Sequence, residues 1–160
     1  TPQDLSAVHP SVPGHDRPTE VRSDLPDDRM RARQLVGEGR HGEAIELLEG
    51  LLNADPANGA VYATLAEAYM AAGDREAAAD SLTLALHHDP DNVDALWSLC
   101  EVNQALGRID AAIPPLERIV ALRGSVKARG ALARLYYAVR RHHDAERTAA
   151  AVVADHPESG

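Results

Sequence analysis

Four segments of the sequence repeat one another at a nearly constant spacing. Alanines recur at steps of 34, 34 and 33 residues, at Ala44, Ala78, Ala112 and Ala145. A second series in the same register consists of Pro56, Pro90, Gly124 and Pro157. A third consists of Gly39, Gly73, Gly107 and Arg140. Three series in one register predict a tandem array, in which each unit packs against the next instead of around one globular centre.

Each unit has the pattern of two helices. In the second unit, apolar residues fall at helical spacing from Tyr62 to Met70 and again from Ala78 to Leu86. Gly73 lies between the two series and is a natural helix stop, because glycine adopts the left-handed conformation readily. The aromatic content is 3% with no Phe, so small and aliphatic side chains form most of the core. The sequence therefore predicts an all-α fold of about four helix hairpins.

The residues on this register match a known 34-residue pattern, W-x2-L-G-x2-Y followed by A-x3-F and P. The second unit carries the pattern at Tyr62, Leu65, Ala66, Tyr69, Ala78, Leu82 and Pro90. The third carries it at Leu96, Leu99, Cys100, Asn103, Ala112, Leu116 and Gly124. The fourth carries it at Arg129, Leu132, Ala133, Tyr136, Ala145, Ala149 and Pro157. The first matches in its second helix, through Ala44, Leu48 and Pro56.

The chain thus resembles the tetratricopeptide repeat family over residues 25–157, and this resemblance implies a right-handed superhelix (a solenoid) of helix hairpins. We expect repeat units near residues 25–58, 59–92, 93–125 and 126–157, followed by a tail at 158–160. Residues 1–24 contain scattered prolines and no helical or strand period. They are predicted to form an extended or disordered arm, because such a segment buries too little apolar surface to offset its ordering entropy.

In this family the first helix of each repeat lines a concave groove. The resemblance therefore implies a groove formed by Arg29, Arg33, Glu67, Met70, Asp94, Trp97, Glu101, Gln104, Lys127, Arg134 and Tyr137. Trp97 is the predicted centre of an apolar anchor site, helped by Met70 and Tyr137. The alternative is that Trp97 packs between units as part of the scaffold.

Charge is unevenly distributed along the chain. Residues 1–122 carry a net charge of −12, whereas residues 123–147 carry +5. In the groove, acidic residues in the middle face a basic end formed by Lys127 and Arg134, and this gradient could align a peptide of matched charge. The alternative is pairing within the chain, such as Glu101 with Arg134, or an ordinary solvated face. The acidic body argues against nucleic acid as a partner.

No catalytic motif is present in the sequence: there is no G-x-S-x-G, no glycine-rich phosphate loop and no H-E-x-x-H. Cys100 occupies a small-residue packing position and is predicted to be an inert buried thiol. The adjacent histidine pairs point in different directions on a helix, so we expect no metal and no cofactor. No apolar run reaches the roughly 18 residues of a membrane span. The sequence does not identify the cellular compartment, with the cytoplasm slightly favoured.

The sequence therefore predicts a non-enzymatic scaffold or adaptor that binds a peptide or partner helix in its groove. One alternative is self-assembly into a homo-oligomer through the last repeat, which no polar capping helix follows. Another is that the chain is the accessory repeat segment of a larger enzyme. A minor one is that the arm docks in a groove. Pro114 and Pro115 predict either a late start or a kink in the second helix of the third unit.

Overall fold

The computed structural model describes residues 25–155, and within that range it contains eight α-helices and no strand. They are α1 (Leu25–Gly37), α2 (His41–Ala54), α3 (Gly59–Ala72), α4 (Arg75–His88), α5 (Val93–Ala105), α6 (Ile109–Arg123), α7 (Val126–Ala138) and α8 (His142–Asp155). The predicted all-α fold is confirmed. The predicted arm at residues 1–24 and tail at 158–160 lie outside the described residues.

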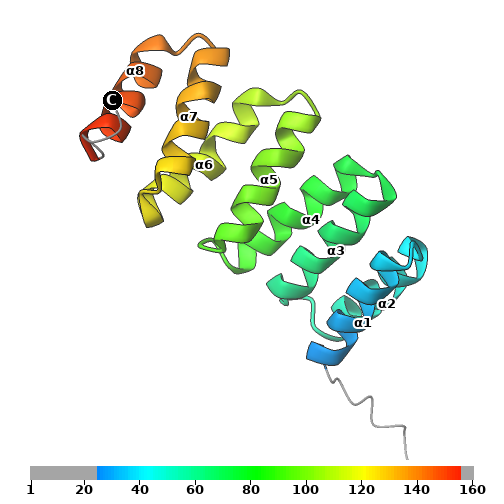
Figure 1. Cartoon of the computed structure of the whole chain (residues 1–160). Helices are drawn as coiled ribbons and strands as arrows, with labels where there is room; N and C mark the ends of the chain where they lie inside the picture. The colour runs from blue at the N-terminus through cyan, green and yellow to red at the C-terminus, as the bar shows by residue number, and fades with distance from the viewer. Residues whose placement is uncertain (1–24, 156–160) are drawn as a thin grey trace, which may run out of the picture.

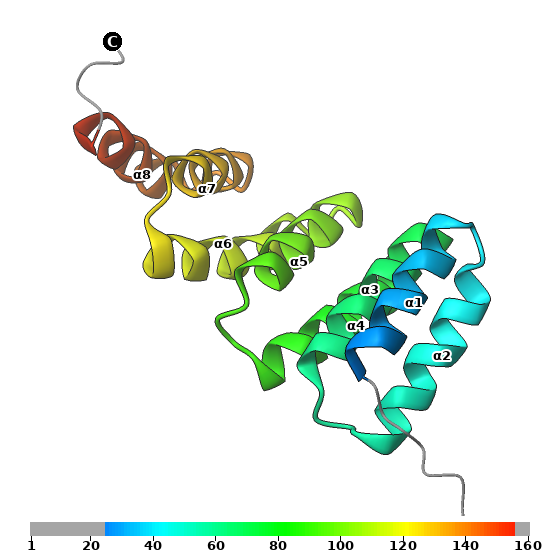
Figure 2. The same ribbon diagram turned by 60° about the horizontal axis from the view of Figure 1, so that its bottom comes forward.

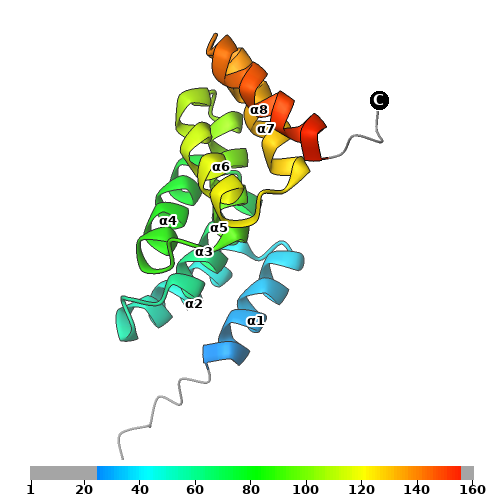
Figure 3. The same cartoon turned by 90° about the vertical axis from the view of Figure 1, so that its left-hand side faces the viewer.

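The helices pack in sequence order as hairpins, α1 with α2 and so on to α7 with α8, and each hairpin packs against the next (Figure 1). α1 also packs against α3, so the first helices of the first two units lie side by side (Figure 2). Figures 1 and 3 show α1 and α8 at opposite ends of the array. The result is a helical solenoid, in which buried residues form three successive clusters along the array.

The repeated alanines mark the most closely packed points of the hairpins. Ala44, Ala78 and Ala112 are 0% exposed and Ala145 is 7% exposed. Each shares a buried cluster with residues of the helix that precedes it in its hairpin, for example Ala32 with Ala44. A methyl group at these positions lets two helix backbones approach, and any larger side chain would overpack the core. This explains why the alanine series is the most regular feature of the sequence.

The glycine series lies in the turns between the two helices of each unit. Gly39, Gly73 and Gly107 have φ angles of 78°, 85° and 74°. Arg140 occupies the fourth such turn with a φ of 61°, and it is the one non-glycine residue with positive φ among residues 25–155. The turn geometry is therefore kept in the last unit although the residue type is not. A side chain in this region is strained by roughly 1 kcal/mol or more.

Both prolines lie inside α6, which begins at Ile109, so the late-start alternative is wrong. Pro115 has no N–H to donate to the carbonyl oxygen of Ala111, four residues earlier. The side chain of Asn103 supplies the missing donor: its Nδ2 lies 3.3 Å from the Ala111 oxygen, and Asn103 is only 6% exposed. The third unit thus accommodates its proline through a buried amide that belongs to its first helix.

The presence of asparagine at this repeat position also changes the contact between the second and third units. In the second and fourth units the same repeat position is Tyr69 and Tyr136, and each donates its hydroxyl hydrogen to a glutamate of the preceding unit. Tyr69 Oη lies 3.1 Å from Glu49, and Tyr136 bonds Glu117. Burial, and then the bond to Glu117, raise the pKa of Tyr136 to about 12.

The second and third units are joined by ion pairs at the surface instead. Arg108 Nη2 lies 2.8 Å from Glu76 Oε1, and Arg118 pairs with Asp91. All four side chains are about half exposed, so each pair contributes little to stability by itself.

Candidate functional site

A cavity of about 540 Å³ lies over the first helices of the first three units. Six of the eleven residues predicted for the groove line it: Arg29, Arg33, Glu67, Met70, Asp94 and Glu101. The other lining residues are Ala60, Ala63, Ala66, Leu82, Asn92, Ala95 and Ser98. The structure therefore brings together the predicted residues of α1, α3 and the N-terminal two-thirds of α5.

The cavity is lined mainly by residues of three first helices, α1, α3 and α5. Arg29 and Arg33 are four residues apart on α1, and Asp94, Ser98 and Glu101 follow at steps of four and three on α5. Residues at these spacings share a helix face. Leu82 was not expected, because it comes from α4, a second helix, whereas the family rule considers first helices alone. Its apolar spacing in the sequence indicated only a core position.

Two charged side chains inside the cavity bind each other. Arg33 Nε lies 2.9 Å from Glu67 Oε2 and Arg33 Nη2 lies 2.8 Å from Glu67 Oε1, a two-pronged contact between α1 and α3. The hydrogen bond to Glu67 is the main reason that the pKa of Arg33 is raised. Pairing within the chain thus occurs in the groove, but at the first two units, not between Glu101 and Arg134 as the sequence alternative named.

Three charged groups of the cavity are left without such a partner. Among residues 25–155, neither Asp94 nor Glu101 makes a side-chain hydrogen bond or ion pair. Arg29 is half-buried, and its Nε is shielded from solvent with no hydrogen-bond partner in the same range. A buried donor without an acceptor is uncommon in folded proteins and carries a desolvation cost.

Trp97 does not line this cavity. It is half-buried and packs against the core cluster of the third and fourth units. The ammonium group of Lys127 lies 4.8 Å from the centre of its ring, a cation–π contact between α5 and α7. This is the packing between units that the sequence left open as the alternative to an anchor site, and the role of Trp97 in binding stays a prediction.

The side chain of Gln104 makes a hydrogen bond within its own helix, α5. Its Nε2 lies 3.1 Å from the Sγ of Cys100, which is 1% exposed. Burial, more than any other cause, raises the pKa of the Cys100 thiol. A thiol that stays protonated and covered is a poor nucleophile, in agreement with the packing role predicted for it.

The last two predicted residues line a different hollow. Arg134 and Tyr137 of α7 face α8 across a space of about 510 Å³, whose other lining residues are Ala133, Ala145, Glu146 and Ala149. Tyr137 is 69% exposed, and its ring meets that of His142 edge-on at 5.1 Å between centroids. The groove expected from the sequence is therefore divided into a charged cavity at the first three units and a mainly apolar hollow at the last.

Neither a metal centre nor a membrane span is found in the part of the chain that the structure describes. No group of three or more His, Cys, Asp or Glu side chains gathers there. No helix within residues 25–155 combines the length and the apolar character needed to cross a bilayer.

The family follows from the sequence match together with this architecture. The family model described as tetratricopeptide repeat matches residues 35–100 and 71–123, which together make up more than half of the 160 residues. The chain belongs to the tetratricopeptide repeat family. The resemblance inferred from the alanine, proline and glycine series is confirmed.

The chain is similar in sequence to part of one curated protein and in fold to several solved structures. Over 85 residues the chain is 29% identical to Superkiller complex protein 3 of Mus musculus, a match that covers 53% of this chain and 5% of that relative. Among solved structures, MamA superposes with a TM-score of 0.66 at 25% identity, covering 79% of this chain and 74% of MamA. YrrB, described as having an unusual peptide-binding site, superposes with a TM-score of 0.71 at 22% identity, covering 86% and 72%.

Proposed function

We propose that this tetratricopeptide repeat chain is a protein-interaction scaffold and that it binds a peptide segment in the cavity over α1, α3 and α5. The observation that carries the proposal is the cavity itself, which three successive first helices line and in which Arg33, Glu67 and Glu101 occupy the same repeat position. The existence of a peptide-binding site in YrrB, which has the same fold, supports it.

The apolar contact in this cavity comes from Met70 and the alanines around it. Met70 is 40% exposed, so its flexible side chain is available to a ligand. Trp97 and Tyr137, expected to share the anchor with Met70, lie at the α5–α7 contact and in the α7–α8 hollow. We therefore propose that the primary site involves the first three units.

A blocked-groove variant tests the proposal. Ala63 lies on the lining face of α3, and Ala63→Trp would fill the cavity. Ala121→Trp, at an exposed position of α6 away from the cavity, is the matched control. Peptides selected from a random library on the full chain should lose at least about tenfold in affinity for the first variant and keep it for the second. Equal binding to both variants would refute the site.

A second candidate function is self-association through the hollow between α7 and α8. Two large exposed side chains favour it, since Tyr137 is 69% exposed and Val153 is 68% exposed. Apolar patches of this kind mark contact surfaces. If this face pairs, sedimentation of the full chain should depend on concentration, and Tyr137→Glu should make it monomeric at all concentrations. A chain that is monomeric from the start would exclude this candidate.

A further inference from the structure

The charged groups of the cavity are arranged with one sign at each end. Its two guanidinium groups, Arg29 and Arg33, are both on α1, whereas its carboxylates are on α3 and α5. Arg33 and Glu67 bind each other and so neutralise the middle of the cavity. What remains is one cation on α1 and two anions, Asp94 and Glu101, on α5. A ligand of complementary charge is thereby oriented as well as attracted.

The α5 end offers several acceptors to one donor group. Asp94, Ser98 and Glu101 share a helix face, so two carboxylates and a hydroxyl line the same side of the cavity. A guanidinium has five N–H donors in a planar fork and can satisfy more than one acceptor at once, which an ammonium does less well. The α5 end is therefore suited to an arginine side chain.

The repeat register explains why these acceptors are not used by the protein itself. The position of Glu67 in the second unit corresponds to Arg33, Glu101 and Arg134 in the others. In the first pair of units the opposite charges meet, but between the third and fourth the Trp97 ring and Lys127 occupy the contact between α5 and α7. Glu101 is thus left facing the cavity.

The α1 end offers an unused donor. Arg29 lines the cavity, and its guanidinium makes no hydrogen bond or ion pair with residues 25–155. Its Nε is covered, but its Nη groups are not among the buried atoms, so a carboxylate of a ligand can pair with them through charge-assisted hydrogen bonds. Between the two ends, Ala60, Ala63 and Ala66 present only methyl groups, which leaves room for the backbone of an extended chain.

From these observations we infer that the cavity recognises an extended peptide segment with an arginine placed against Asp94 and Glu101 and an acidic group placed against Arg29. The inference rests on the proposed function, since it names the chemistry of the ligand for the same site. α1 and α5 are two helix positions apart, roughly 16–20 Å, so the two charged groups of the peptide are separated by about five residues of extended chain.

The test begins with random peptides of about ten residues displayed and selected on the full chain. We expect the selected sequences to be enriched in one arginine and one acidic residue at this spacing. The double variant Asp94→Asn/Glu101→Gln should bind them at least about tenfold more weakly. The double variant Glu46→Gln/Asp80→Asn removes the same charge from exposed positions of α2 and α4 and should bind them as the unchanged chain does.

Arg29→Gln supplies the second arm. It should weaken a selected peptide that has an acidic residue, and it should have no effect once that residue is replaced by glutamine in the peptide. Thermal melting of each variant shows that the repeat array is still folded at the temperature of the binding measurement.

The outcomes separate the two proposals. If Ala63→Trp abolishes binding but the α5 variant and its control behave alike, or if the selected peptides lack a basic residue, the groove is correct and the charge-oriented ligand is wrong. If Ala63→Trp leaves binding unchanged, the proposed function fails and this inference fails with it.

Discussion

Two contacts between first helices, one at each end of the array, use the same repeat positions in opposite ways. Between α1 and α3 the contact is polar, a two-pronged pair of Arg33 with Glu67, and Ala63 beside it leaves open space. Between α5 and α7 the position of Ala63 is taken by Trp97, whose ring packs on the core and carries Lys127. The same repeat position thus carries a methyl group that lines the cavity in the second unit and a ring packed on the core in the third.

This difference shows that the repeat register and the lining of the cavity are set by different residues. The register depends on buried alanines and on turn residues with positive φ, which are alike in all four units. The surface depends on the lining positions, where the units have arginine, glutamate, glutamate and arginine in turn. A family match therefore identifies the first set and says little about the second.

The largest effect should come from removing the Trp97 ring, which packs against the core cluster of the third and fourth units. Trp97→Ala should lower the free energy of unfolding by about 2–4 kcal/mol, somewhat below the cost for a fully buried tryptophan because Trp97 is half-buried. Tyr137→Ala, at a 69% exposed position, should change it by less than about 1 kcal/mol. Urea denaturation of both variants measures the two values. A small loss for Trp97→Ala would return this residue to the list of ligand anchors.

The third unit should depend on its buried amide in a way that the second and fourth do not. Asn103→Ala leaves the Ala111 carbonyl without its donor, and we expect a loss of about 1–3 kcal/mol. In a Pro115→Ala background a backbone N–H is available again, so the same substitution should cost clearly less. The double-mutant cycle is measured by chemical denaturation. Equal costs in both backgrounds would mean that the amide and the proline are not coupled.

Glycine in the last turn, as in the first three turns, should stabilise the fold. Arg140→Gly relieves a positive φ at a position where glycine has none of the strain, and we expect a gain of about 1 kcal/mol in the free energy of unfolding. The reverse change, Gly73→Ala, should cost a similar amount, although nothing lies within 4 Å of the added carbon. Thermal unfolding of the two variants measures both signs. A loss for Arg140→Gly would point to a contact of the Arg140 side chain that outweighs the backbone strain.

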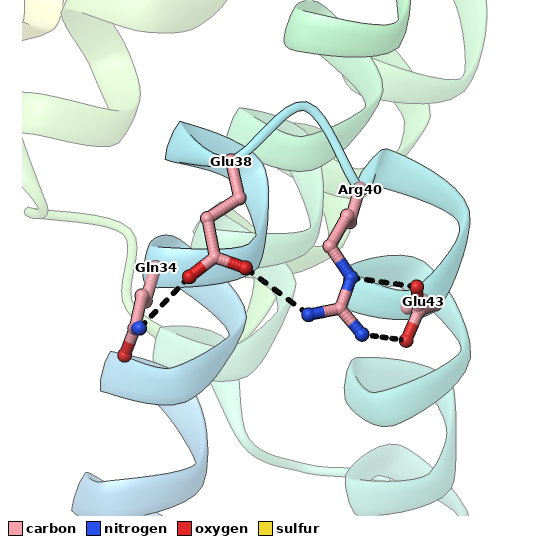
Figure 4. A network of polar contacts seen from close by, with 4 residues as sticks. All are labelled: Gln34, Glu38, Arg40 and Glu43. Atoms are coloured by element: carbon pink, nitrogen blue, oxygen red, sulfur yellow. Dashed lines mark hydrogen bonds and ion pairs between the residues drawn. The ribbon is translucent and has the colours of Figure 1, made fainter.

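The smallest effect concerns the turns at the two ends, where Arg40 and Arg141 occupy the same repeat position. Arg141 binds Asp144, three residues on, and Arg40 binds Glu43 in the same way but also Glu38, which Gln34 holds in turn (Figure 4). The bond from Gln34 and then that from Arg40 lower the pKa of Glu38, and Arg40 lowers the pKa of Glu43.

Because both pKa values are lowered on folding, these carboxylates stabilise the fold at a pH above their ordinary value of 4.5. That contribution is lost as the pH falls through the lowered values. NMR titration of the side-chain carboxyl carbons should show Glu38 and Glu43 titrating below 4.5, and Arg40→Gln should move both back toward it. Unchanged titration in that variant would show that the ion pairs are not formed in solution. The effect on stability is small because all these groups are exposed.

Much of the fold could be predicted because its constraints are local and repeated. Four alanines at one spacing indicate helix contacts, and Gly39, Gly73 and Gly107 indicate turns that need a left-handed residue. Arg140 could be placed in the fourth turn from register alone. The position of Pro115 within α6 could not, because a proline near a helix start and one inside a helix look alike until the donor to the freed carbonyl is known.

Helical periodicity and the repeat length were enough to predict the helix hairpins and their number, because both are properties of the chain taken a few residues at a time. The faces expected to line a groove came from the family resemblance. Which of those residues share a space depended on the packing of the hairpins. It placed Arg29, Glu67 and Glu101 around one cavity and put Trp97 in a contact between units. The reason is that a groove is the volume left over after neighbouring hairpins have packed, and this depends on the size of the side chains that meet between helices far apart in the sequence.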